Sequence, residues 1–244
     1  MKLSVRWIVI AVFFISSLLL LPNSAFADNQ TLNDLSWPNC NEKITSLSTS
    51  GIIGINNGLG FSHNPCLAQE SLLFHNDYSL YLNTGYPGIS YGLMYKDGPK
   101  HCQLDNLNCL AYNFGYNDAV YSMKYAWNQD SHSFTWWLDV ETENSWTNSF
   151  TQNREALTGM IAAIHKYAFM PTVGFYSYPG QWQLITKDWT NLLPAWVATG
   201  SDSKQIAAGY CLDSFNGGPT WLTQYTRYLD INYNCLGLNV NILR

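Results

Sequence analysis

Short runs of apolar, β-branched and aromatic residues recur along the chain, and several are followed by glycine, proline or asparagine. This pattern is typical of buried strands separated by turns. Other segments carry apolar residues at helical spacing, as where Ala156, Met160 and Ala163 share one face. The predicted strands are residues 34–37, 52–56, 79–83, 135–141, 172–177, 195–198, 220–225 and 229–232, and the predicted helices are residues 117–127, 154–167 and 202–211.

The order of these elements predicts the fold class. Strands that alternate with helices indicate an α/β protein with a parallel sheet, and eight strands favour closure into a (β/α)8-type, TIM-like barrel. The connection between residues 225 and 229 is too short for a helical crossover. We therefore expect an irregular barrel with short or missing helices late in the chain, and an open doubly wound sheet is the alternative.

The first 27 residues have the pattern of a secretory signal peptide. Lys2 and Arg6 precede an apolar run at residues 7–21, and Ala25-Phe26-Ala27 is a small-x-small cleavage pattern. The run is shorter than the roughly 20 residues that a spanning helix needs. We expect cleavage near Ala27, a single domain over residues 28–244, and an exported protein that is free of the membrane after cleavage. An uncleaved anchor is the alternative.

Composition narrows the possible partners. The formal net charge is −5, and no cluster of cations offers a surface to a phosphate backbone, which argues against nucleic acid. Aromatic residues make up 15% of the chain and charged residues 12%. Most of these rings pack in the core, and we expect some to line a binding surface.

Six cysteines follow the predicted signal peptide, and an exported chain meets an oxidising compartment where an even count favours bridges. Cys102 and Cys109 flank a short polar loop and are the easiest pair to close. Two further pairs, each joining neighbouring elements, would complete the set. The predicted pairs are Cys40 with Cys66, Cys102 with Cys109, and Cys211 with Cys235.

The strongest candidate for chemistry is the strand at residues 135–141. Side chains alternate along a strand, so Trp137, Asp139 and Glu141 share one face. The two acids would lie roughly 6.6 Å apart at their Cα atoms, at the strand end where barrel enzymes place catalytic groups. Mutual repulsion would keep one of them protonated as a general acid, as glycosidic cleavage requires. A structural alternative is that the acids cap the next helix or pair with Arg154.

Two more acids lie on the first and last predicted strands, which adjoin in a closed barrel. Asp34 lies on the first strand and Asp230 on the eighth, so three strands would bring four carboxylates to one mouth. Lys and Arg are scarce nearby in the sequence, which makes a structural network of salt bridges a less natural explanation.

Six segments together resemble glycoside hydrolase family 25, the lysozyme-like muramidases, in order and spacing over nearly the whole of residues 28–244. The segments are Asp34-Leu35-Ser36, Leu138-Asp139-Val140-Glu141, Val173-Gly174-Phe175-Tyr176-Ser177, Ala195-Trp196-Val197-Ala198, Gln224-Tyr225 and Leu229-Asp230-Ile231-Asn232. Other motifs resemble more closely an exported, disulfide-bearing bacterial branch of these barrels, which implies a secreted or periplasmic bacterial protein; they are Trp37-Pro38-Asn39-Cys40, Gly54-x-Asn56-x-Gly58, Asn64-Pro65-Cys66, the segment from Asp139 to Trp146, and Phe215-Asn216-Gly217-Gly218.

The resemblance implies a glycoside hydrolase that cleaves a β-linked amino-sugar polymer, with peptidoglycan as the expected substrate. Glu141 matches the family's general acid, Asp139 matches the partner that stabilises the oxocarbenium-like transition state, and Asp34 and Asp230 match further inward acids. The sequence departs from the family at residues 37–40, where Trp-Pro-Asn-Cys follows the first strand. The residues expected to bind substrate are Trp37, Tyr81, Trp137, Tyr176, Trp196, Gln224 and Asp230.

Other functions fit less well. A catalytically inactive barrel that binds carbohydrate or cell wall is the main alternative, although a binder needs no acid pair. The five histidines lack the spacing of metal ligands, so no metal or other cofactor is expected. Residues 88–92 match Gly-x-Ser-x-Gly but lack the strand before and the helix after, which predicts a loop. We expect the protein to be a monomer.

Overall fold

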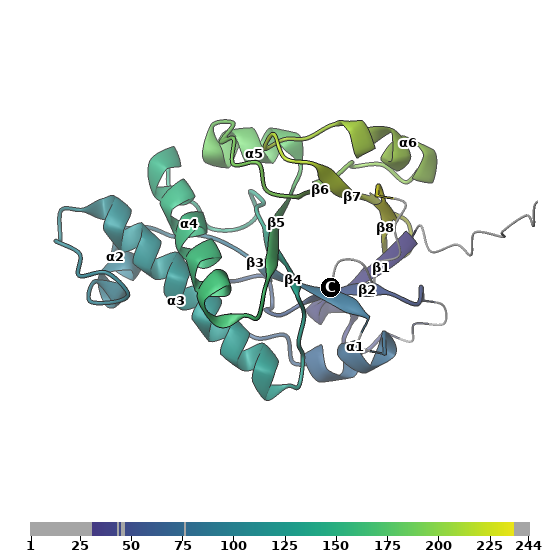
Figure 1. The fold of residues 1–244 in the computed structure, drawn as a ribbon, viewed down its shortest axis with the longest axis horizontal. Helices are drawn as coiled ribbons and strands as arrows, with labels where there is room; N and C mark the ends of the chain where they lie inside the picture. The colour runs from purple at the N-terminus through teal and green to yellow at the C-terminus, as the bar shows by residue number, and fades with distance from the viewer. Residues whose placement is uncertain (1–30, 43, 45–46, 76, 237–244) are drawn as a thin grey trace, which may run out of the picture.

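Eight strands close into a barrel and follow one another around it in sequence order (Figure 1). The computed structural model describes residues 31–42, 44, 47–75 and 77–236, so the predicted signal peptide lies outside the described residues. The closed barrel confirms the predicted fold class. The strands are β1 (Thr31–Leu35), β2 (Gly51–Gly54), β3 (Tyr78–Asn83), β4 (Thr135–Asp139), β5 (Thr172–Ser177), β6 (Ala195–Ala198), β7 (Thr220–Thr226) and β8 (Asp230–Asn234).

The last strand corrects the expectation of a wholly parallel sheet. Strands β1 to β7 pair in parallel, but β8 runs antiparallel to both β7 and β1. The reason is the short link, in which the Arg227 N–H donates to the Leu229 carbonyl at 3.1 Å and turns the chain back at once. Because β8 is reversed, its first residue, Asp230, lies at the end of the barrel where β1 finishes.

The three predicted helices are present, with different bounds. α3 starts earlier than predicted because the Asn106 side chain caps it, accepting from the Cys109 N–H at 3.1 Å. The short helix α2 forms where residues 88–92 were predicted to be a loop, and α1 and α5 were not predicted. The α-helices are α1 (Leu67–Leu73), α2 (Ile89–Gly92), α3 (Leu107–Asn128), α4 (Phe150–Tyr167), α5 (Pro179–Thr186) and α6 (Lys204–Gly209), and the 3-10 helices are η1 (Trp37–Asn39), η2 (Leu93–Tyr95) and η3 (Tyr210–Leu212).

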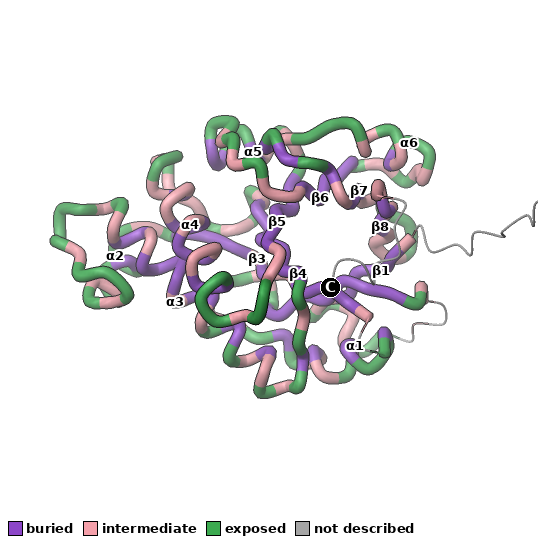
Figure 2. Tube along the Cα trace, in the orientation of Figure 1, coloured by how far each residue is buried: buried purple, intermediate pink, exposed green. Residues whose placement is uncertain are grey.

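Strands β2, β4 and β6 are buried at every residue, and therefore on both faces, whereas β8 is only partly buried; the strand residues are largely purple in Figure 2. On β4, Trp136 and Leu138 pack in the large apolar cluster beneath the helices. Trp137, between them, belongs to a smaller cluster inside the barrel together with Trp196 and Tyr176. The alternation of side chains therefore sends Asp139, which has the same parity as Trp137, into the barrel mouth.

Helices α3 and α4 lie side by side on the flank of the barrel that β4 and β5 form (Figure 1). Two glycines permit their close approach. A Cβ on Gly115 would lie 1.9 Å from the Ala156 carbonyl oxygen, and one on Gly159 would lie 2.0 Å from that of Tyr112. This packing fixes the start of α4, and with it the loop that follows β4.

All three predicted disulfides are present. Cys40 pairs with Cys66, Cys102 with Cys109, and Cys211 with Cys235. The first joins the segments that follow β1 and β2, the second joins the segment after β3 to the first turn of α3, and the third ties η3 to the segment after β8. Among the described helices, none has both the length and the apolar character needed to span a membrane.

Candidate active site

A cleft of about 280 Å³ opens at the carboxyl ends of the parallel strands. Five acids line it: four come from the ends of β1 and β4 and from the start of β8, and the fifth, Glu42, follows η1 and accepts from Asn39 Nδ2 at 3.1 Å. Its described lining includes neither Lys nor Arg. The four acids at the strand ends are Asp34, Asp139, Glu141 and Asp230. The structure thus brings together the four carboxylates that the sequence singled out.

Asp139 is the last residue of β4 and is almost fully buried. One carboxylate oxygen, Oδ2, accepts a hydrogen bond from the Asn83 side-chain amide at the end of β3. The other, Oδ1, is buried without a hydrogen-bond partner among the described residues. Burial, followed by repulsion from Glu141 and Asp34, raises the pKa of Asp139 well above its usual value, and only the Asn83 bond opposes this.

Asp34 lies on β1 and is held by two amide groups from the last two strands, β7 and β8, which close the barrel against β1. Its Oδ2 accepts from Gln224 Nε2 at 2.8 Å and from Asn232 Nδ2 at 3.0 Å. Burial and the nearby charge of Asp230 outweigh these bonds and raise the pKa of Asp34 from 3.8 to about 7.

Aromatic side chains orient both amides. The Tyr176 hydroxyl donates to Gln224 Oε1 at 2.6 Å, and Trp196 Nε1 donates to Asn232 Oδ1 at 2.8 Å. Each amide can then present only its NH2 group to Asp34. The position of this carboxylate is therefore determined by side chains on β5, β6, β7 and β8.

Glu141 lies two residues after the end of β4. Its side chain is half-buried and is therefore more accessible than that of Asp139. Its backbone carbonyl accepts from Trp146 Nε1 at 2.8 Å and from the Asn144 N–H at 3.2 Å, which fixes the loop. Burial raises the pKa of Glu141 from 4.5 to about 7, with further increases from Glu143 and Asp230. Because no hydrogen bond from a described residue holds its carboxyl group, that group is free to meet a ligand.

The alternative that these acids serve the fold does not match their contacts. Ser149, and not either acid, caps α4 by accepting from the Gln152 N–H at 3.4 Å. Arg154 donates to the carbonyl oxygens of Thr186 and Lys187, at 2.6 and 2.8 Å. Neither structural role that the sequence left open is therefore filled by Asp139 or Glu141.

The predicted substrate-binding residues divide into two groups. Tyr81, Tyr176, Trp196, Gln224 and Asp230 line the cleft. The Tyr81 and Trp196 rings meet edge to face at 6.1 Å, and Asp230 Oδ1 accepts from Thr226 Oγ1 at 2.7 Å.

Two tryptophans are placed differently from our expectation. Trp137 has no exposed surface, and its Nε1 donates to Ser79 Oγ at 3.2 Å, so it packs inside the barrel and offers no ring to a ligand. Trp37 is 46% exposed on η1, but it does not line the cleft. The alternation of side chains along β4 predicts correctly that Trp137 points into the barrel. It does not predict how far below the mouth of the barrel the side chain lies.

The sequence interpretation overlooked two asparagines that hold the acids. Asn83 ends β3 beside Asp139. The Asn56 side chain fixes the Asn83 backbone, because it accepts from the Asn83 N–H at 3.0 Å and donates to the Asn83 carbonyl at 2.9 Å. Asn232, fully buried on β8, bonds to Asp34. A polar residue at the end of an apolar strand was the signal that could have identified Asn83.

In the part of the chain that the structure describes, no three His, Cys, Asp or Glu side chains are arranged to hold a metal ion.

Comparison with known proteins agrees with this geometry. Residues 109–205, which include Asp139 and Glu141, match the family model described as Lysozyme-like protein 1. The fold is similar to the catalytic domain of endolysin ply40 from bacteriophage P40 of Listeria monocytogenes, with a TM-score of 0.54, 16% identity, and coverage of 87% of this chain and 96% of that one.

It is also similar to GHIP, a glycosyl hydrolase 25 of Streptococcus pneumoniae described as a virulence factor that participates in host cell invasion. That match has a TM-score of 0.55 and 13% identity, and covers 88% of this chain and 90% of the other. No relative is found among the curated proteins. The chain therefore has the fold of a lysozyme-like, glycoside hydrolase family 25 barrel.

Proposed function

We propose that the protein is an exported glycoside hydrolase that cleaves a β-linked amino-sugar polymer, with peptidoglycan as its substrate. The observation that carries the proposal is the carboxyl group of Glu141. Its pKa is raised to about 7, no described residue binds it by a hydrogen bond, and it faces a cleft that also holds Asp139 and Asp34. A protonated, accessible carboxyl group beside further acids is the arrangement that acid-catalysed glycosidic cleavage requires.

In this proposal Glu141 donates its proton to the glycosidic oxygen as the bond to the anomeric carbon breaks. Positive charge then develops on the sugar ring. Asp139 passes its proton to water in the cleft as this charge develops, because a nearby cation favours the charged form of a buried carboxyl group, and the Asp139 carboxylate then stabilises the ring. Water attacks the anomeric carbon and gives a proton to the Glu141 carboxylate, which completes the hydrolysis and restores the acid. Asp34, fixed by Gln224 and Asn232, adds to the negative potential of the cleft.

The other lining groups suit a sugar ligand. Gln224 and Asp230 offer hydrogen-bonding groups to hydroxyls, and the partly exposed Tyr81 ring adds apolar surface, whereas Trp196 is almost fully buried and supports the wall from behind. The three disulfides support a site of action outside the cytoplasm. We accordingly propose a secreted or periplasmic bacterial protein that acts as a monomer and uses no cofactor.

The test is digestion of purified peptidoglycan and, separately, of chitin oligosaccharides by the purified protein. We expect new reducing ends at the amino-sugar linkages of peptidoglycan, identified by mass spectrometry. Binding to the glycan without new ends would support the alternative of an inactive, cell-wall-binding barrel. If the protein neither bound nor cleaved either polymer, the proposal would be contradicted.

A further inference from the structure

A second cavity, of about 300 Å³, lies on the same end of the barrel as the acidic cleft. Its walls are mainly carbon, with aromatic rings from Phe61, Tyr91, Tyr95 and Phe114. None of the described residues that line it carries a charge. The cavity therefore favours an uncharged ligand with a flat apolar face.

The two cavities are built from the same two loops. On the loop after β3, Asn83 lines the cleft, and the next residues, Thr84 and Gly85, line the cavity. On the loop after β4, Glu141 lines the cleft, whereas Asn144 and Ser145 line the cavity. The Asn144 N–H donates to the Glu141 carbonyl at 3.2 Å, so a single turn separates the two sites. One extended ligand can therefore occupy both.

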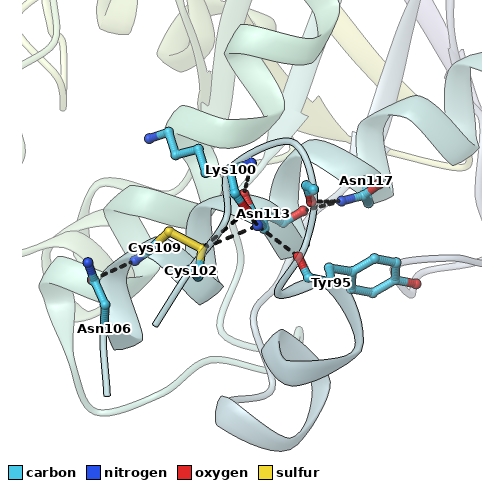
Figure 3. The surroundings of a disulfide bond; sticks show 8 residues. Tyr95, Lys100, Cys102, Asn106, Cys109, Asn113 and Asn117 are labelled. Carbon is cyan, nitrogen blue, oxygen red and sulfur yellow. Dashed lines mark hydrogen bonds between the residues drawn. A yellow bond between two sulfur atoms is a disulfide. The ribbon is translucent and has the colours of Figure 1, made fainter. Parts of the chain in front are cut away.

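The outer wall of the cavity belongs to the segment between β3 and α3, which projects beyond α3 and carries α2 and η2 (Figure 1). Figure 3 shows how this segment is fastened. The Asn113 side-chain amide donates to the Tyr95 and Lys100 carbonyls at 2.7 and 2.6 Å, and the disulfide between Cys102 and Cys109 closes the base. Tyr95 is thus held in place by α3.

The opposite wall, at residues 58–61, is held equally firmly. Asp118, fully buried on α3, accepts from the Phe61 N–H at 2.7 Å. The Phe61 ring then stacks on Tyr95, with centroids 5.0 Å apart and planes 7° from parallel. Exposed Tyr91 (52%) and Met94 (72%) complete the rim. Both walls are preformed, which lowers the entropic cost of binding a ligand.

We propose that this cavity binds an acetylated amino-sugar ring of the polymer whose neighbouring portion occupies the acidic cleft. The inference rests on the proposed function and adds a substrate-length requirement to it. The C–H face of the ring and its acetyl methyl group would pack on the Tyr91 and Tyr95 rings. Thr84 and Ser145 offer hydroxyls, and Asn144 Nδ2, which has no acceptor among the described residues, suits an acetamide oxygen.

Two methionines give a site-specific assay. Met94 lines the cavity and is 72% exposed, whereas Met170 is 78% exposed in the loop that precedes β5, at the opposite end of the barrel. The protein would carry labelled methionine methyl groups and Glu141→Gln to prevent cleavage. It would be titrated with a disaccharide and with an oligosaccharide of about eight sugars, both from peptide-free peptidoglycan. We expect the longer ligand to shift the Met94 methyl signal in the NMR spectrum and to leave Met170 unmoved.

A matched pair of variants tests the contact. Tyr91→Ala should weaken binding of the longer oligosaccharide about tenfold, as expected for loss of one stacking ring. Tyr167→Ala, which removes an exposed tyrosine at the opposite end of the barrel, should leave that affinity unchanged. Binding of the longer glycan without a Met94 shift, or with equal affinity in both variants, would overturn the inference and leave the proposed function intact. Failure of the unmodified protein to bind or cleave any glycan would overturn both.

Discussion

Replacing Glu141 by Gln is the most direct test of the proton-donor assignment. With a pKa of about 7, a carboxyl group is about 97% protonated at pH 5.5, whereas at its usual 4.5 it would be about 9% protonated. The elevated pKa therefore supplies about tenfold more competent enzyme at that pH. General acid catalysis itself contributes roughly 100- to 10,000-fold, and a glutamine cannot provide it. We expect Glu141→Gln to reduce the rate of cleavage by that factor, without loss of folded protein.

The assay is the initial rate of reducing-end release from purified peptidoglycan between pH 4 and 8. Glu143→Gln serves as the matched control for the rate at pH 5.5, well below the high-pH limb that Glu143 influences, because Glu143 is an exposed acid two positions along the same loop. Circular dichroism and the thermal midpoint of each variant would check folding. If Glu141→Gln retained more than about a tenth of the rate at pH 5.5, Glu141 would not be the general acid and the reasoning from its pKa would be wrong.

Three further outcomes are expected. Glu143→Gln should shift the high-pH limb of the rate profile to lower pH, because Glu143 helps to raise the pKa of Glu141; an unmoved limb would contradict this coupling. The free energy of unfolding, measured by urea denaturation, should fall as pH rises from about 4 to 7, since burial raises the pKa of Asp118 from 3.8 to about 7 and the folded state binds the proton more tightly. Asp118→Asn should flatten that slope, and an equal slope in both proteins would refute the account. Replacing Cys102 and Cys109 by Ser should lower the free energy of unfolding by about 2 kcal/mol for so short a loop, and an unchanged urea midpoint would argue against the bridge.

The strand pattern was readable from the sequence because most strands are buried on both faces and appear as continuous apolar runs. β5 and β6 were predicted with the bounds that the structure has. Helix bounds were less accurate. The first half of α3 contains Asn113 and Gly115, residues of low helix propensity, yet it is helical because tertiary contacts use both: Asn113 fastens the segment before α3, and Gly115 admits α4. Neither contact can be read from local propensity.

The convergence of Asp34 and Asp230 was predicted from the adjacency of the first and eighth strands, and the strands do pair. That reasoning assumed a parallel barrel, in which the first residue of β8 would lie at the opposite end from the mouth. The acids meet because β8 is antiparallel, and a link too short for a helix is what forces the reversal. The same short link had been interpreted only as an irregularity. A link of this length also requires β8 to run antiparallel to β7, and that requirement places Asp230 at the mouth of the barrel.

The absence of cations from the described lining of the cleft determines what its acids can do. In a salt-bridge network, Lys or Arg would lower the pKa of each carboxyl group and keep it ionised. Here burial and mutual repulsion act in the same direction, and amide groups from Asn83, Gln224 and Asn232 are the described donors that oppose them. Neutral donors hold a carboxyl group in position but compensate only part of its charge. The cluster therefore retains protons near neutral pH, and Glu141, whose carboxyl group accepts no hydrogen bond from a described residue, is the acid placed to give its proton away.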